Sequence, residues 1–189
     1  IVIPDRIEAG TYMLAAAMTG GEITIENTMT EHLKPVIAKL RESGVEIAEE
    51  FNCINVKAAR RPKAVDVKTH PYPGFPTDMQ AQMTAFLSQA EGTSIVVETI
   101  FENRFMHIAE LKRMGARIKI DGRTAIIEGG VQLMGAQVRA TDLRAGAALV
   151  LAGLCAKDRT EISDIHHVDR GYEAMEKKLQ ALGAKIIRV

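Results

Sequence analysis

The sequence of 189 residues contains no tryptophan, and aromatic residues make up only 4% of it. So few aromatic side chains argue against a surface on which nucleic-acid bases stack. Lysine and arginine together number 24, and so do aspartate and glutamate. Without a net charge, the chain has no overall field that would attract nucleic acid or an anionic membrane. We therefore expect neither as a partner, and any anion site must be local.

Cysteine and long apolar runs are scarce as well. Cys53 and Cys155 lack the spacing of a metal or redox motif and form no disulfide framework, which favours a reducing, cytoplasmic location. The longest apolar run, 145–156, is too short for a bilayer, which takes about 20 residues. The histidines also lack metal-ligand spacing, so we expect no metal ion and no cofactor.

A sequence pattern with a leucine four residues before a glycine occurs three times. Gly44, Gly115 and Gly183 end these copies, which lie about 70 residues apart, the spacing of an internal repeat. Each glycine is placed to end an amphipathic helix before a short strand, because glycine adopts positive φ easily.

Each amphipathic helix is preceded by a mostly apolar helix with an acidic first turn. The expected apolar helices span 5–18, 78–90 and 142–156. The expected strands beside them span 22–26, 94–98, 160–163, 64–68 and 136–140. A hairpin that turns at Asp121-Gly122 closes the second copy.

These patterns predict an α/β (α+β) fold of three β-α-β-α-β-β units, at about 1–60, 61–132 and 133–189. Helices that are apolar all round are buried, so the three apolar helices would pack at the centre with the sheets outside. A solenoid is the alternative arrangement. The first unit begins with a stub of strand at 1–3 and the third stops before its last strand. We therefore expect one lobe of a larger protein.

The stretch 70–82 combines a rigid loop with the start of a helix. Its three prolines restrict φ at their own positions and at the residues before them, so 70–76 cannot be helical. Thr77 is placed as an N-cap and Gln80 stands three residues on, which is the pattern of a capping box. Asp78 would then lie in the first helical turn, held by an inflexible loop.

Two interpretations of Asp78 are open. An acid in the first turn complements the helix dipole, and Asp5 and Asp142 occupy equivalent places in the other units. Only the second unit, however, puts three prolines before its acid, which is more rigidity than a cap requires. That difference favours a carboxylate aimed at a ligand.

Two arginines and one loop are further candidates for chemistry. Arg144 and Arg170 lie at expected helix starts, where guanidinium groups would add donors to a place suited to anions. Ion pairs with the neighbouring Asp142 and Asp169 are the structural alternative. Residues 98–105 join a strand to a helix with two phenylalanines and mixed charges, which indicates either a functional loop or core packing.

Specific runs of residues occur at 75–82, 98–107, 142–147 and 169–173. In this order they resemble the UDP-N-acetylglucosamine 1-carboxyvinyltransferase family, the UDP-GlcNAc enolpyruvyl transferases. The resemblance covers essentially the whole chain and places it in the C-terminal part of that family, somewhat under half of its length. It implies two similar lobes, each an inside-out α/β barrel of three β-α-β-α-β-β units. The chain would be one lobe, with the missing N-terminal lobe of the same protein as its partner.

The resemblance also implies a reaction. The enolpyruvyl group of phosphoenolpyruvate is transferred to the 3-hydroxyl of UDP-GlcNAc, and phosphate is released. This is the first committed step of peptidoglycan synthesis, and so serves cell wall biogenesis, cell shape and cell division. No metal and no cofactor are implied.

Site residues follow from the matching positions. The implied substrate-binding residues are Asp78, Ile100, Phe101, Arg104, Asp142, Arg144 and Arg170. Asp78 and Arg170 are the implied catalytic residues, with Asp78 as a proposed general base at the 3-hydroxyl. The three arginines would offset the phosphate and carboxylate charges of phosphoenolpyruvate and the tetrahedral intermediate. Asp78 is thus expected to be both helix cap and catalytic group.

One departure from the family limits the expected activity. The family's general acid, usually a cysteine on a mobile loop, belongs to the other lobe, and neither Cys53 nor Cys155 matches it. We therefore expect the chain alone to be inactive. One alternative is a 3-phosphoshikimate 1-carboxyvinyltransferase, although residues 75–82 and 99–105 do not resemble that enzyme. A second alternative is a non-catalytic nucleotide-sugar-binding module.

Overall fold

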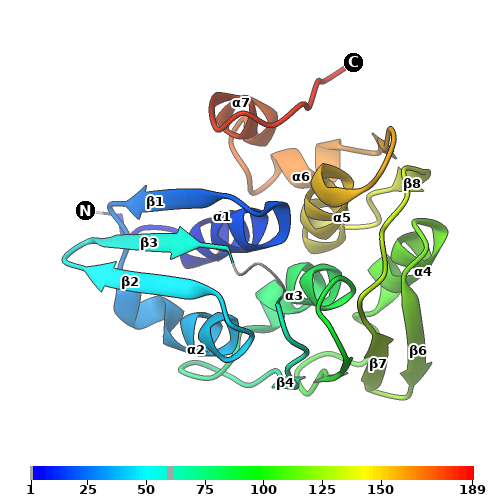
Figure 1. Ribbon diagram of the computed structural model, residues 1–189, viewed down its shortest axis with the longest axis horizontal. Helices are drawn as coiled ribbons and strands as arrows, with labels where there is room; N and C mark the ends of the chain where they lie inside the picture. Colours follow the sequence, from blue (N-terminus) through cyan, green and yellow to red (C-terminus); the bar gives the residue numbers. More distant parts are fainter. Residues whose placement is uncertain (1, 59–61) are drawn as a thin grey trace.

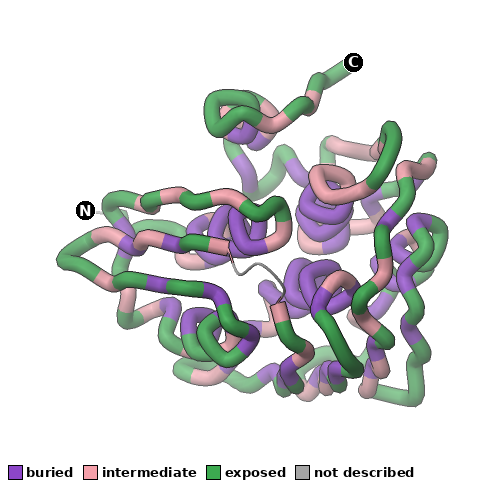
Figure 2. The backbone as a smooth tube through the Cα atoms, viewed as in Figure 1, coloured by how far each residue is buried: buried purple, intermediate pink, exposed green. Residues whose placement is uncertain are grey.

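The centre of the fold is a bundle of three buried helices. The computed structural model describes residues 2–58 and 62–189 (Figure 1). Helices α1 (Arg6–Thr19), α3 (Gln80–Leu87) and α5 (Leu143–Cys155) pack against one another and are buried along most of their length (Figure 2). The strands lie outside them, as predicted. Helices that are apolar all round can only be stable in such an interior.

Small residues let these segments approach closely. A Cβ on Gly10 of α1 would come within 2.9 Å of the Met79 side chain, and a Cβ on Gly146 of α5 would overlap Val168. Interiors pack as densely as organic crystals, so there is no room for a larger side chain at either position. The alanine-rich and glycine-rich character of these helices therefore follows from their packing.

The three amphipathic helices end in the same way. They are α2 (Lys34–Glu42), α4 (Met106–Arg113) and α7 (Met175–Ala181). The glycine that follows each has positive φ, at +96° for Gly44 and +95° for Gly115 and Gly183. The next N–H donates to a leucine carbonyl at 3.0 Å, from Val45 to Leu40, Ala116 to Leu111 and Ala184 to Leu179. This is the Schellman arrangement, so the predicted C′ glycines are confirmed.

Two sheets show the expected strand pattern. In the first, β1 (Glu22–Glu26), β3 (Cys53–Lys57) and β2 (Glu46–Glu50) are antiparallel in the order β1-β3-β2. In the second, β4 (Val67–Lys68), β5 (Thr93–Val97), β7 (Thr124–Glu128) and β6 (Arg117–Asp121) follow the order β4-β5-β7-β6, with only β4–β5 parallel. The predicted hairpin at Asp121-Gly122 is thus confirmed, and the second unit shows the whole β-α-β-α-β-β order.

Strand β4 is shorter than the sequence predicted. The expected strand covered 64–68, but only Val67 and Lys68 pair with β5. Before Val67, side chains take the place of backbone hydrogen bonds between the two strands. The Ile95 N–H donates to Asp66 Oδ1 at 2.8 Å, and the Val65 N–H donates to the Ser94 hydroxyl at 3.1 Å. Short polar side chains compete with backbone pairing in this way.

The third sheet has two strands, β8 (Gln137–Arg139) and β9 (Glu161–Ser163), which pair in parallel. The strand expected after Gly183 is absent from residues 184–189. In the other units the corresponding strand, β2 or β6, pairs with the strand that follows it, and a strand without a partner leaves its backbone groups unpaired. Val2 and Ile3 also form no strand. Ile1 and the expected unit boundary at 60–61 lie outside the described residues.

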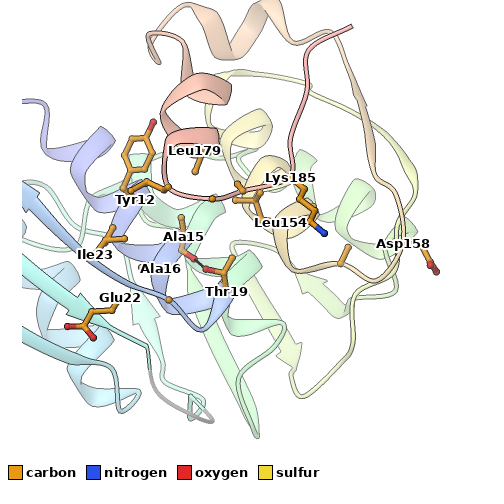
Figure 3. Close-up of a pocket in the computed structure, with 16 residues that line it drawn as sticks. Tyr12, Ala15, Ala16, Thr19, Glu22, Ile23, Leu154, Asp158, Leu179 and Lys185 are labelled. Carbon is orange, nitrogen blue, oxygen red and sulfur yellow. Dashed lines mark hydrogen bonds between the residues drawn. The ribbon is translucent and has the colours of Figure 1, made fainter.

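A cavity of about 490 Å³ lies between the start of β1 and the C-terminal part of the chain (Figure 3). It opens between α1, α5, α7 and the segment after Gly183. Its apolar lining includes Tyr12, Ile23, Leu154 and Leu179. The cavity therefore borders residues 183–185, where the expected strand is absent.

The last amphipathic helix, α7, is preceded by a separate short helix. Helix α6 (His166–Asp169) is separated from α7 by a turn in which Ala174 has a φ of +45°. The reason is Tyr172, which is only 1% exposed and inserts its side chain into the core. Two 3₁₀ turns, Thr30–Leu33 and Thr77–Met79, complete the secondary structure. No helix within 2–58 and 62–189 is long and apolar enough to span a membrane.

Candidate active site

The proline loop, residues 70–76, is followed by a 3₁₀ turn that contains Thr77 and Asp78 and precedes α3. Residues 71–76 are not helical, as predicted. The predicted capping box is wrong, because neither the 3₁₀ turn nor α3 has a side-chain cap hydrogen bond. The Thr77 hydroxyl instead donates to Glu98 Oε2 at 2.8 Å and accepts from Arg104 Nη1 at 2.8 Å. Hydrogen bonds to charged groups are stronger than those to a neutral N–H, which accounts for the choice.

The three first-turn acids do not behave alike. Asp5 Oδ1 accepts hydrogen bonds from two N–H groups of α1, at 2.7 and 3.2 Å. Asp142 Oδ1 accepts from two N–H groups of α5, at 2.8 and 2.9 Å. Asp78 accepts none from its helix, so the expectation that it is also a cap is wrong. Its carboxylate is free to face other side chains.

Asp78 is held between two arginines. Its Oδ1 accepts from Arg104 Nη2 at 2.6 Å and its Oδ2 from Arg144 Nη2 at 3.1 Å. Burial is the largest single influence on the Asp78 pKa and raises it, but the charges and hydrogen bonds of Arg144 and Arg104 together hold the pKa below its ordinary value. The carboxylate is therefore ionised at neutral pH.

Glu98 organises the loop beside Asp78, and the sequence reasoning missed it. Its side chain is 1% exposed, and its Oε1 accepts from the Thr69 hydroxyl at 2.9 Å, from the Ile100 N–H at 2.8 Å and from the Phe101 N–H at 3.2 Å. Its Oε2 accepts from Thr77. A charged residue directly after an apolar strand was the available signal, since a buried carboxylate must find several donors.

The loop presents two apolar side chains near the arginine pair. Ile100 is 37% exposed and Phe101 is 50% exposed. The Arg104 guanidinium lies over the Phe101 ring, with Cζ 4.6 Å from the ring centroid, which is a cation–π contact. Arg104 is thus oriented by Asp78, Thr77 and Phe101 together.

A buried histidine lies behind this loop. His107 is 2% exposed, and its Nε2 has no hydrogen-bond partner among the described residues. Burial, assisted by the charge of Arg104 and opposed by Asp142, lowers the pKa of His107 to about 4. The ring is therefore neutral at physiological pH and packs in the interior.

The remaining sequence-predicted residues divide into two groups. Asp142 caps α5, and Arg144 reaches Asp78 rather than the adjacent Asp142. Arg170 is exposed at the end of α6, not at the start of α7, and its side chain makes no ion pair or hydrogen bond with any described residue. Asp169 pairs instead with Arg188, at 2.9 Å. The structure therefore brings Asp78, Arg104 and Arg144 together and leaves Arg170 without a side-chain partner in the described part of the chain.

An open cavity of about 530 Å³ adjoins Asp78. It is lined by the start of α1, by His32 and by Tyr72 of the proline loop. The Arg6 guanidinium carbon lies 5.2 Å from the Tyr72 ring centroid, and the His32 ring meets Tyr72 edge-on at 6.1 Å. Space for a ligand is therefore present next to the carboxylate. Across the described ranges, no group of three or more histidine, cysteine, aspartate or glutamate side chains could hold a metal ion.

Comparison with known proteins identifies relatives along the whole chain. The family model described as EPSP synthase (3-phosphoshikimate 1-carboxyvinyltransferase) matches residues 1–179. UDP-N-acetylglucosamine 1-carboxyvinyltransferase 1 of Caldanaerobacter subterraneus subsp. tengcongensis is 67% identical over 187 residues, which is 99% of this chain and 45% of that protein. The enzyme of the same name from Halothermothrix orenii is 61% identical over 188 residues, 100% of this chain and 45% of its own. The chain thus spans somewhat under half the length of these relatives.

A shorter relative and two solved structures agree with this. The UDP-N-acetylglucosamine 1-carboxyvinyltransferase of Desulfofundulus thermocisternus is 60% identical over 187 residues, covering 99% of this chain and 77% of that protein. The enolpyruvyl transferase NikO from Streptomyces tendae superposes with a TM-score of 0.85 at 28% identity, over 97% of this chain and 44% of that one. EPSP synthase from Acinetobacter baumannii gives 0.76 at 18% identity, over 100% and 45%, and supports the fold alone.

The expected fold class and family resemblance are both confirmed by these matches. The fold is that of the enolpyruvyl transferases, with buried central helices and sheets outside. At 60% identity over more than two thirds of a relative's length, the chain belongs to the UDP-N-acetylglucosamine 1-carboxyvinyltransferase family.

Proposed function

We propose that this chain is one lobe of an enzyme that transfers the enolpyruvyl group of phosphoenolpyruvate to the 3-hydroxyl of UDP-GlcNAc, releasing phosphate. The observation that supports this best is Asp78, whose two carboxylate oxygens are bound by Arg104 and Arg144 next to an open cavity. The names of relatives 58% to 67% identical to this chain match the activity. The 3-phosphoshikimate enzyme, the alternative, shares the fold at far lower identity.

The proposed role of Asp78 is to accept the proton of the 3-hydroxyl. The hydroxyl oxygen bonds to C2 of phosphoenolpyruvate while a proton adds to C3, giving a tetrahedral intermediate. Loss of a C3 proton then expels phosphate and restores the double bond. A general base must be ionised and within hydrogen-bond reach of the proton that it takes. The lowered pKa of Asp78 meets the first condition.

The proposed role of Arg104 and Arg144 is to bind the anionic groups of phosphoenolpyruvate and of the intermediate. Guanidinium groups suit phosphate and carboxylate because they donate several hydrogen bonds in one plane. These anions would compete with Asp78 for the same donors. Weakening the two ion pairs would raise the Asp78 pKa and make the carboxylate a stronger base. Binding of phosphoenolpyruvate would in this way activate the proton acceptor.

The proposed UDP-GlcNAc contacts are Ile100 and Phe101. Both are partly exposed on a loop whose backbone N–H groups are fixed by Glu98, so they present apolar surface at little cost in entropy. Asp142 and Arg170 complete the proposed site, Asp142 at the start of α5 and Arg170 after α6.

The proposed enzyme needs a second lobe. The division of this lobe into units at about 1–60, 61–132 and 133–189 is part of the proposal. The other lobe would supply the general acid, a cysteine on a mobile loop, together with a lysine–asparagine pair and further arginines. We place the reaction in the cytoplasm, at the first committed step of peptidoglycan synthesis, through which it would serve cell shape and cell division.

Phosphate release tests the proposal. The measurement uses this chain alone and the two-lobe protein, in which the chain is continuous with the further lobe that its relatives carry. With phosphoenolpyruvate and UDP-GlcNAc, the two-lobe protein should release phosphate and the lone chain should not. Turnover with shikimate 3-phosphate instead would assign the 3-phosphoshikimate reaction. Binding of UDP-GlcNAc without any turnover would indicate a nucleotide-sugar-binding module.

A further inference from the structure

Three polar side chains from distant parts of the chain meet in the core. Thr11 of α1, Gln82 of α3 and Tyr172, between α6 and α7, are all at most 1% exposed. The Thr11 and Tyr172 hydroxyls lie 2.9 Å apart, and Gln82 Nε2 lies 3.3 Å from each of them. Buried hydrogen bonds of this kind are costly to leave unmade, so they hold the three segments in one arrangement.

The direction of these hydrogen bonds follows from counting protons. A threonine hydroxyl has one proton, and Thr11 donates it to the Ile7 carbonyl at 2.8 Å. Tyr172 must therefore donate to Thr11. Gln82, through its amide, donates to the oxygens of both. The tyrosine hydroxyl is thus the donor that joins the last segment of the chain to α1.

The segment that carries Tyr172 is also fixed against α5. The Gly171 and Tyr172 N–H groups donate to the Val168 carbonyl at 3.1 and 3.0 Å. A Cβ on Gly171 would come within 2.9 Å of the Leu143 side chain, and Val168 fills the space over Gly146. Residues 168–172 therefore lie between α5 on one side and the buried hydroxyl network on the other.

This placement matters for two residues of the proposed site. Arg170 lies two residues before Tyr172 and has no side-chain partner of its own among the described residues. Asp78 lies four residues before Gln82, in the 3₁₀ turn that leads directly into α3. The hydrogen bonds among Gln82, Thr11 and Tyr172 therefore connect the backbone that carries Asp78 to the backbone that carries Arg170.

We propose that Tyr172 is a positioning residue, whose hydroxyl, bound to Thr11 and Gln82, sets the place from which Arg170 reaches phosphoenolpyruvate. The inference rests on the proposed function, in which Arg170 binds that substrate. Tyr172 itself is buried, so its effect on the substrate would pass through Arg170. A guanidinium on an unsupported loop would lose part of its binding energy to ordering, and the tyrosine removes that cost.

The test is Tyr172→Phe in the two-lobe protein, which deletes one oxygen. The KM for phosphoenolpyruvate should rise at least about fivefold, because the hydroxyl's hydrogen bonds to Thr11 and Gln82 are both lost, while the KM for UDP-GlcNAc stays within about twofold. A purely structural effect would differ, because a smaller folded fraction lowers kcat for both substrates and leaves both KM values unchanged.

The chain offers a matched control in Tyr12→Phe. Tyr12 is a second buried tyrosine, adjacent to Thr11 in α1, and its hydroxyl has no hydrogen-bond partner among the described residues. The substitution removes the same atom from the same core without breaking a hydrogen bond. Both KM values should stay at wild-type levels.

Thr11 gives a second pair of variants. Thr11→Val removes the acceptor for Tyr172 and should raise the KM for phosphoenolpyruvate as Tyr172→Phe does. Thr11→Ser keeps the hydroxyl and should leave this KM at the wild-type value. The combination of Thr11→Val with Tyr172→Phe should raise this KM by less than the two separate effects combined, because both changes break the Thr11–Tyr172 hydrogen bond and each removes one further bond from Gln82.

Arg170→Ala separates failure of this inference from failure of the proposed function. A raised KM for phosphoenolpyruvate in Arg170→Ala with none in Tyr172→Phe overturns the positioning role and leaves the function standing. An unchanged KM in Arg170→Ala overturns the role of Arg170, and the positioning role with it. Equal shifts for both substrates in Tyr172→Phe also contradict the inference.

Discussion

Asp78 and Arg144 lie 66 positions apart in the chain, yet Oδ2 of the first accepts a hydrogen bond from Nη2 of the second at 3.1 Å. The two residues stand at the starts of α3 and α5, the pair of helices that pack most extensively at the centre. The contact therefore joins two units of the fold at the place where the proposed chemistry occurs.

Asp78→Asn in the two-lobe protein should lower kcat by about 100-fold or more, the usual contribution of a general base, because an amide cannot accept the hydroxyl proton. The KM for UDP-GlcNAc should change by less than about threefold, since the side chain keeps its size and one acceptor oxygen. Steady-state phosphate release gives both values. Asp66→Asn is the control, because among the described residues the carboxylate of Asp66 accepts one hydrogen bond, from the Ile95 N–H. A kcat near wild type in Asp78→Asn would refute the base assignment.

The stability of the chain should depend on pH through Asp78. Its pKa is lowered in the folded state, so its ion pairs contribute fully above the ordinary aspartate pKa of about 3.9 and are lost as pH falls through the lower folded value. Urea unfolding should show wild type more stable than Asp78→Asn at pH 7, with the difference shrinking below about pH 4. A difference that is constant from neutral to acidic pH would contradict this.

Glu98→Gln should loosen the loop that carries Ile100 and Phe101. One carboxylate oxygen becomes an amide that cannot accept the Thr77 proton, and a buried group left unsatisfied costs about 1–3 kcal/mol of unfolding free energy. Denaturant unfolding measures this loss, and the KM for UDP-GlcNAc should rise with it. Glu102→Gln, an exposed position in the same loop, should change stability by less than about 0.5 kcal/mol. Equal stability of the two variants would exclude an anchoring role for Glu98.

Arg104→Lys should impair the site although it keeps the charge. Arg104 donates to Asp78 and Thr77 through two different nitrogens and lies over the Phe101 ring, which a single ammonium group cannot reproduce. The KM for phosphoenolpyruvate should rise about tenfold, corresponding to about 1.4 kcal/mol of binding. Arg113→Lys, at an exposed position of α4, is the comparison and should behave as wild type. If the two substitutions have the same effect, the planar geometry of Arg104 is unimportant.

Local patterns predicted the local structure well. The glycines after α2, α4 and α7 were recognisable because a C′ residue needs positive φ, and that requirement belongs to one helix end. The hairpin at Asp121-Gly122 is likewise a property of adjacent residues. The strand expected after Gly183 failed because a strand needs a partner, which its own residues cannot specify.

The site was predictable only in part. The residue patterns made Asp78 and Arg144 candidates and the family resemblance added Arg104, and the structure brings the three together. It did not select Glu98, whose importance comes from the donors that the fold brings to it. Tyr172 lies within the run 169–173, but its role could not be predicted because its partners Thr11 and Gln82 lie on other helices.

The amino-acid sequence by itself determined the repeated unit, the buried central helices and the ends of the outer helices, because each depends on the spacing of apolar residues and glycines along a short segment. Only the tertiary structure decided what the three first-turn acids do. Asp5, Asp78 and Asp142 look alike in the sequence, but two accept N–H groups of their own helices and one accepts arginines. A carboxylate binds the strongest donors within reach, and the fold alone places guanidinium groups beside Asp78.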